Sequence, residues 1–275
     1  MFKVLKKIFN VIIYSFAVIG AVLMLAFVAN KSGLTKQDGI VEKADYFNHS
    51  RLLEKNQDYP WLNTGEYLTL KKAMVKEKSV LEKVESETGI RSRLFASLLL
   101  VEQLRLYSSD REIYKKFFEP LNVLGVQSQF SWGVLGLKRE TLIKIEENLK
   151  NPESEYYLGD AATAKFGPTL ELKSNNPEDE RFQRIIDPVN HYYTYLYAGL
   201  FLKQIENQWE KAGFPISDKP EILATLYNIG FANSKPKANP EAGGAEIEIA
   251  GEKYSFGRLA YEFYYSDELV DVFPR

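Results

Sequence analysis

The chain has 275 residues, of which 45% are hydrophobic and 26% charged, and its formal net charge is −2 at neutral pH. These fractions are typical of a globular protein, and the balanced charge excludes the basic footprint of most nucleic-acid-binding proteins. The absence of cysteine excludes disulfides and thiolate chemistry, and the only histidines, His49 and His191, have no metal-ligand spacing. We therefore expect no nucleic-acid partner, no metal and no cofactor.

The N-terminal segment contains an apolar run without a charged side chain, residues 11–29, preceded by three lysines. A helix of this length just crosses a hydrocarbon core of about 30 Å, and lysines favour the cytoplasmic side. The run predicts a single-pass anchor over residues 1–30 in the inner (cytoplasmic) membrane, with the following chain on the periplasmic side. A cleaved signal peptide is the alternative, but Phe27 occupies a place where cleavage requires a small residue.

The following residues divide into a polar tether, 31–60, and one domain, 61–275. Helical spacing of apolar residues, with Gly, Pro and capping residues at the ends, predicts that this domain is mainly α. Alternating apolar and charged residues at 245–254 predict a small β-hairpin, and the polar stretch 151–187 is expected to be an irregular insertion. Helices are expected over residues 66–87, 93–107, 110–118, 140–149, 188–211, 218–227 and 256–265.

Glu102 is the candidate catalytic residue. It stands among leucines on one face of the helix predicted over 93–107. Apolar neighbours disfavour the ionised carboxyl and raise its pKa, which suits a general acid that works near neutral pH. A structural ion pair with Arg105 or Arg139 is the alternative, because such pairs also perturb carboxyl groups.

Two further motifs follow Glu102 in the chain. A Ser-Trp-Gly loop occupies 131–133, and an Ala-x-x-Tyr-Asn-x-Gly segment occupies 224–230. Taken singly, the first is compatible with a turn and the second with a helix C-cap. In this order, the three elements resemble the soluble lytic transglycosylase and goose-type lysozyme families. The sequence departs from that pattern at Gly136, where those families commonly have Gln.

The resemblance implies a lysozyme-like α-rich fold and a peptidoglycan substrate, cleaved between N-acetylmuramic acid and N-acetylglucosamine. Glu102 would protonate the leaving oxygen, then take the proton of the muramic acid O6 hydroxyl as a 1,6-anhydro ring closes. Ser131 and Gly133 would bind the sugar. Tyr227 would lie close to Glu102, and Asn228 would brace the loop. The resemblance thus implies a lytic transglycosylase with one catalytic carboxyl group, and the predicted helix at residues 1–30 would anchor it in the membrane.

Three alternatives remain open. A lysozyme-type hydrolase needs a second acid, and Asp110, Glu112 and Glu119 follow Glu102 without a distinguishing context. A biosynthetic peptidoglycan glycosyltransferase would have Asp after the catalytic Glu, where this chain has Gln103. A catalytically inactive lysozyme-like scaffold that only binds the wall is the third.

Overall fold

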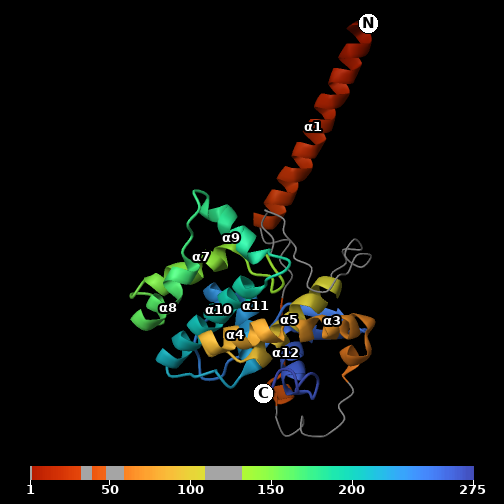
Figure 1. Cartoon of the computed structure of the whole chain (residues 1–275). Coiled ribbons are helices and arrows are strands. Elements are labelled where there is room, and N and C mark those ends of the chain that lie inside the picture. Colours follow the sequence, from red (N-terminus) through yellow and green to blue (C-terminus); the bar gives the residue numbers. More distant parts are fainter. Residues whose placement is uncertain (1, 32–38, 48–58, 109–131) are drawn as a thin grey trace. The chain divides into compact units, whose positions relative to one another are not determined.

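The structure of the chain is a computed structural model that describes residues 2–31, 39–47, 59–108 and 132–275 (Figure 1). It divides into two compact units, Met1–Asp38 and Gly39–Arg275. The described residues are mainly helical, with two short antiparallel strand pairs. The prediction of a mainly α fold with a small hairpin is therefore confirmed.

The first unit contains the long helix α1 (Phe2–Lys31). The apolar side chains described on it, including Phe16 and Leu25, are largely exposed. Among the described residues, no helix is both long enough and apolar enough to cross a membrane. The transmembrane helix predicted for this segment thus has no support from the structure.

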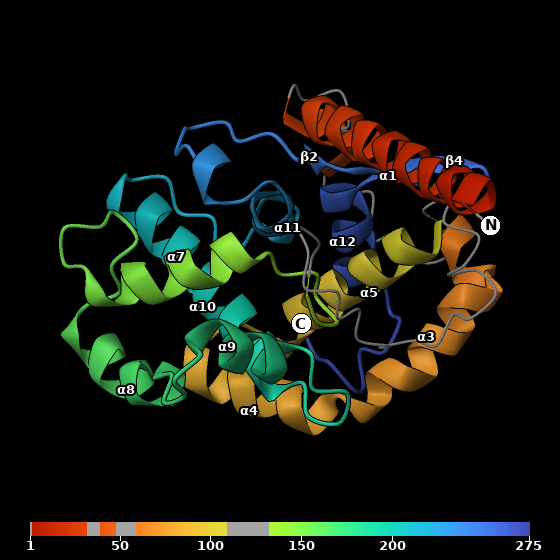
Figure 2. The same ribbon diagram turned by 90° about the horizontal axis from the view of Figure 1, so that it is seen from above.

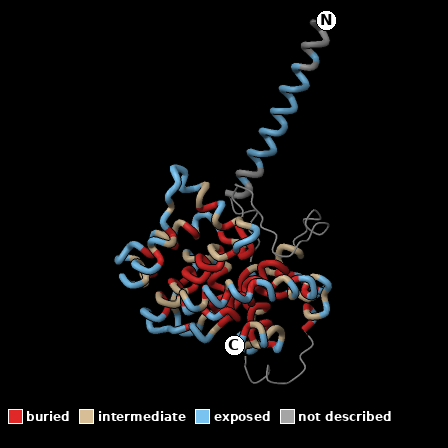
Figure 3. Tube along the Cα trace, in the orientation of Figure 1, coloured by how far each residue is buried: buried red, intermediate tan, exposed pale blue. Residues whose placement is uncertain are grey.

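The second unit is a bundle of helices. Figure 2 shows α3 and α8 at opposite ends of this unit, with α5, α11 and α12 between them. The buried part of the chain, drawn red in Figure 3, runs through these central helices and α10. The helices are α3 (Gly65–Lys76), α4 (Lys78–Thr88), α5 (Ser92–Ser108), α7 (Arg139–Lys150), α8 (Asp160–Leu170), α9 (Pro177–Ile185), α10 (Tyr192–Lys211), α11 (Pro220–Ile229) and α12 (Phe256–Tyr265), with short 3-10 helices at Ala44–Phe47, Pro60–Asn63 and Phe231–Asn233.

Two pairs of strands complete this unit. The hairpin predicted over 245–254 is confirmed, since β3 (Glu246–Ile249) pairs antiparallel with β4 (Glu252–Ser255). A second pair joins β1 (Ile40–Val41) to β2 (Gly243–Gly244). The second unit begins at Gly39, so β1 and the residues up to Phe47 belong to it, although the sequence predicts a tether over 31–60.

The single helix predicted over 66–87 is wrong. The chain forms α3 and α4 instead, and Glu77 is the cap residue between them. Glu77 Oε2 lies 3.0 Å from Nδ1 of His191, a residue distant in sequence. No glycine or proline marks the break, so periodicity alone could not locate it. Gly89, by contrast, ends α4 in the left-handed conformation, as the sequence predicts.

The irregular insertion predicted over 151–187 is also wrong, because it contains α8 and α9. Asn176 caps α9 by accepting a hydrogen bond from the backbone of Asp179, and Pro177 opens the helix. These signals are present in the sequence, but the polar composition concealed them. The predicted start of the next helix at 188 shifts to Tyr192, and the helix predicted over 110–118 lies outside the described residues.

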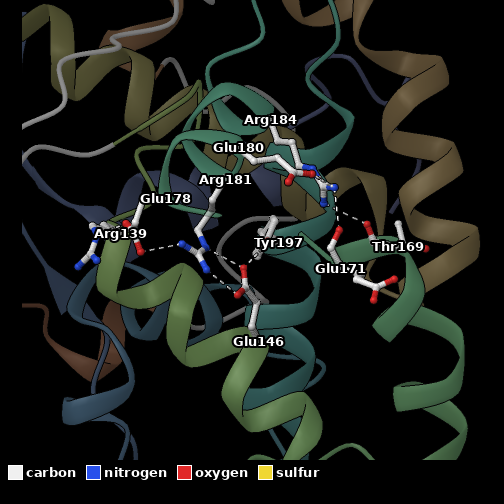
Figure 4. A network of polar contacts seen from close by, with 9 residues as sticks. All are labelled: Arg139, Glu146, Thr169, Glu171, Glu178, Glu180, Arg181, Arg184 and Tyr197. Carbon is white, nitrogen blue, oxygen red and sulfur yellow. Dashed lines mark hydrogen bonds and ion pairs between the residues drawn. The ribbon is translucent and has the colours of Figure 1, made fainter. Parts of the chain in front are cut away.

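A polar network fastens α9 to α7 and α10 (Figure 4). Arg181 donates from Nε and Nη2 to the two carboxylate oxygens of Glu146, at 2.8 and 2.9 Å. The Tyr197 hydroxyl donates to Glu146 Oε1 at 2.6 Å. Two-pronged pairing of a buried guanidinium with a carboxylate fixes both position and orientation. Glu178 extends the network to Arg139 at the start of α7.

Arg93 joins α5 to the C-terminal end of the chain. Its side chain is fully buried and donates five hydrogen bonds to backbone carbonyls that follow or end α12. Carbonyls at a helix C-terminus lack partners within the helix, so the guanidinium supplies donors to buried acceptors there. Two of them, Phe263 O and Ser266 O, also accept from the Ser266 hydroxyl and from Arg275. The acceptors belong to Phe263, Tyr264, Ser266, Glu268 and Phe273.

We predict that Arg93→Met lowers the free energy of unfolding by about 3 kcal/mol or more, because buried carbonyls lose their donor. Urea unfolding measures the change. Arg91→Met is the matched control, since Arg91 is exposed and donates to the Tyr264 hydroxyl. The control should change stability by less than about 0.5 kcal/mol. Equal losses in the two variants would contradict this role of Arg93.

Candidate active site

A loop formed by residues 132–137 is held between α5 and α11. An antiparallel bridge closes its two ends. The backbone carbonyl of Val134 accepts a hydrogen bond from Gln103 Nε2 on α5, and that of Leu135 accepts one from the Tyr227 hydroxyl on α11, both at 2.8 Å. Because both donors are buried, these bonds fix the loop relative to the two helices.

The loop packs directly on the carboxyl group of Glu102. Only 3% of Glu102 is exposed. A Cβ atom at Gly136 would lie 3.0 Å from Glu102 Oε2, and Gly136 has a φ of +62°. The left-handed backbone favours glycine here, and a Cβ atom would also press on the carboxyl group of Glu102. A Gln at this position, as in the resembling families, would displace the carboxyl group of Glu102.

Arg105 forms an ion pair with Glu102 one helical turn further along α5. Its Nη2 and Nε atoms donate to Glu102 Oε2 at 2.6 and 3.1 Å. Burial raises the pKa of Glu102, while the positive charges of Arg105 and Lys138 lower it, and burial dominates. The ion pair anticipated as the alternative interpretation thus exists, formed by Arg105, whereas Arg139 pairs with Glu178.

Tyr227 lies beside this ion pair, but its hydroxyl bonds the loop. Burial, and next the charge of Glu102, raise the pKa of Tyr227 well above its usual value, so the phenol stays protonated. The hydroxyl donates to Leu135 O. Tyr227 therefore positions the loop that packs on Glu102, rather than holding the carboxyl group itself.

Glu102 opens on a pocket of about 120 Å³ between α5, α7, α10 and α11. The pocket brings together three of the predicted site residues: Glu102, Tyr227 and Asn228. Its other polar side chains come from Arg105, Lys138 and Thr141. A carboxyl group with a raised pKa at the wall of such a pocket can donate a proton to a bound oxygen atom. The lining residues are Glu102, Arg105, Gly136, Leu137, Lys138, Thr141, Phe201, Tyr227, Asn228, Ile229 and Gly230.

Gly133 does not line this pocket. A Cβ atom there would lie 2.8 Å from both the Ile185 carbonyl oxygen and Thr194 Oγ1, so Gly133 packs toward α9 and α10. Ser131 lies outside the described residues. The acids considered for water activation, at positions 110, 112 and 119, also lie outside them.

Sequence reasoning missed several residues of the pocket. Arg105 was considered only as a structural partner, although its spacing of three residues places it on the same helix face as Glu102. Gly136 stands out in the sequence only as a departure from the family pattern. Thr141 and Phe201 carry no local signal, because only the packing of α7 and α10 brings them to the pocket.

No family model matches the chain, and comparisons with curated proteins and with solved structures found no significant match.

We predict that Gly136→Ala costs about 1–3 kcal/mol more stability than Gly251→Ala. Both glycines have a positive φ, but a Cβ at Gly251 meets nothing within 4 Å, whereas at Gly136 it meets Glu102. The difference between the variants thus isolates the contact with the carboxyl group. Urea unfolding of both proteins measures it, and equal losses would rule out a tight contact at Gly136.

We also predict that the raised pKa of Glu102 makes stability depend on pH. The folded protein retains this proton above the pH at which the unfolded chain loses it. The stabilisation is therefore fully present below the unfolded pKa and is lost as pH rises through the folded pKa. Glu102→Gln cannot titrate, so its stability relative to wild type should increase from pH of about 4 to about 8. Urea unfolding at both values measures this, and a difference independent of pH would contradict the shift.

Proposed function

We propose that the second unit is a lysozyme-like domain that cleaves peptidoglycan glycan strands as a lytic transglycosylase, with Glu102 as its only catalytic carboxyl group. The observation that carries this proposal is the position of Glu102, which is buried on α5, has a raised pKa and lines a pocket with Tyr227 and Asn228. A glycosidic general acid needs this combination of a retained proton and access to the substrate.

In the proposed reaction, Glu102 donates its proton to the glycosidic oxygen as the bond to the muramic acid carbon breaks. The N-acetyl group of the substrate stabilises the positive charge that develops on that carbon. The carboxylate of Glu102 then accepts the proton of the O6 hydroxyl, whose oxygen bonds to the same carbon and closes the 1,6-anhydro ring. The hydroxyl is already tethered to the reacting centre, so no second carboxyl group is needed to position water.

Arg105 has a role in this cycle that follows from its geometry. Its guanidinium lies 2.6 Å from Glu102 Oε2 and is partly exposed. It therefore stabilises the carboxylate formed by proton donation, while burial favours the protonated form. These opposed effects suit a group that gives up a proton and takes one back. Lys138 adds a second positive charge near the carboxyl group.

The same ion pair favours a second candidate function. A carboxylate bound by Arg105 also suits a structural residue, in which case the domain would bind the wall without cutting it. Synthesis of glycan strands from a lipid-linked precursor is a third outcome. Wall binding yields no product and synthesis yields longer strands, so product analysis distinguishes both alternatives from lysis.

The proposed location at the inner membrane rests on sequence alone, on the charge-free run of residues 11–29 and the lysines before it. The substrate belongs to the periplasmic side, where this topology would hold the second unit.

We predict that Glu102→Gln reduces the release of soluble fragments from purified sacculi by at least about 100-fold, because an amide cannot act as a general acid. Wild-type protein should release fragments with 1,6-anhydro ends, which mass spectrometry identifies. Glu206→Gln is the matched control. Glu206 is another largely buried carboxyl group whose pKa burial raises, but it lies on α10 and does not line the pocket. This control should retain activity.

The products decide between the alternatives. Reducing ends without anhydro rings would indicate hydrolysis, and polymerisation of lipid-linked precursor would indicate synthesis. Wild-type protein that sediments with sacculi but releases nothing would support the wall-binding scaffold and overturn the enzymatic proposal.

A further inference from the structure

Residues 39–47, which we call the strap, lie against β2, the strand that precedes the β3–β4 hairpin. The strap begins with β1, in which Ile40 stands opposite Gly244 of β2. The pairing continues where the backbone N–H of Glu42 donates to Ala242 O at 2.9 Å. The strap is thus hydrogen-bonded to a segment about two hundred residues away in the chain.

The approach of these two strands depends on glycine. A Cβ atom at Gly243 would lie 2.2 Å from the Ile40 carbonyl oxygen. A Cβ atom at Gly39 would lie 2.7 Å from the Gly244 carbonyl oxygen. Because both neighbours are backbone atoms, which cannot rotate away as a flexible side chain can, any larger residue would force the strap and β2 apart.

The other side of β2 packs on α11. A Cβ atom at Gly244 would lie 2.9 Å from Asn228 Oδ1, and the same oxygen accepts a hydrogen bond from Ala245 N at 2.9 Å. One turn earlier on α11, Thr225 Oγ1 accepts from Gly243 N at 2.9 Å. Thus β2 fills the space between the strap and the end of α11 that lines the pocket.

Side chains anchor the rest of the strap to β4 and α12. Glu42 Oε1 accepts a hydrogen bond from Ser255 N at 3.1 Å. The Tyr46 hydroxyl donates to the buried carboxylate of Glu262. The guanidinium of Arg258 lies 4.5 Å from the centre of the Tyr46 ring, a cation–π distance. These anchors fix the strap at both of its ends.

We propose that the strap is a positioning element for the pocket. By holding β2 against α11, it fixes Asn228 on the pocket wall that Glu102 shares. Neither the strap nor β2 lines the pocket, so their effect passes through Asn228. The catalytic consequence rests on the proposed function, whereas the mechanical link between strap and Asn228 does not.

The test uses Tyr46→Phe and Glu42→Ala in the full chain, each of which removes one anchor. We expect the amides of Glu42 and Ala245 to exchange hydrogen about tenfold faster together, because the loss of one anchoring hydrogen bond favours opening by about this factor. The Gly230 amide, bonded within α11 to Leu226 O, should not change. The kcat for fragment release should fall about tenfold, because Asn228 is misplaced rather than removed. The KM should change by less than about twofold.

Two controls accompany these variants. Asp45→Asn alters an exposed residue of the strap and should change neither exchange nor turnover. Glu42→Gln keeps an acceptor for Ser255 N and should restore both readouts relative to Glu42→Ala.

Faster exchange at Glu42 with unchanged exchange at Ala245 would overturn the link between strap and Asn228. Unchanged kcat despite faster exchange at Ala245 would overturn the positioning role. If wild-type protein releases no fragments, the proposed function fails, and hydrogen exchange still decides whether the strap holds Asn228.

Discussion

The close approach of the loop at Gly136 to the Glu102 carboxyl group is the constraint on which the site depends. Gly136 has a left-handed backbone that favours glycine, and its loop is held from both sides. Those holding bonds come from Gln103, the immediate neighbour of Glu102, and from Tyr227 on α11. The helix that carries the carboxyl group and α11, which also lines the pocket, therefore fix the same loop.

This close packing determines the electrostatics of the site. Excluding water from a carboxyl group disfavours its charge, and the positive charges of Arg105 and Lys138 oppose that effect without cancelling it. A carboxyl group under these opposed influences can exchange a proton with a bound substrate. Its raised pKa also makes the folded protein less stable as pH rises. Groups with perturbed pKa values concentrate at functional sites.

The structure directs several distant segments toward α11. The loop reaches it through Tyr227, and β2 reaches it through Thr225 and Asn228. The strap adds a layer behind β2 at a separation that only glycine permits. Small residues thus set the spacing in two places, once against the candidate acid and once behind the pocket wall.

Much of the fold could be predicted from the sequence, because local signals are strong where burial and capping coincide. The helix over 93–107, the hairpin and the helix at 256–265 follow from periodicity and from their end residues. The break at Glu77 has no glycine or proline to mark it, and the residue there contacts the distant His191, whereas the capping signal of α9 is concealed by polar composition. The first helix end has no local signal, and the second has one that outward polarity hides.

By itself, the sequence determined that the protein is mainly helical and that Glu102 stands on an apolar helix, because both follow from residue order along one element. Only the tertiary structure decided what surrounds that carboxyl group. Arg105, Gly136 and Asn228 reach the same pocket because three separate elements pack together, and Gly133 is turned toward α9 instead. Contacts between distant segments leave no periodic trace in a single sequence, since each depends on the packing of both partners.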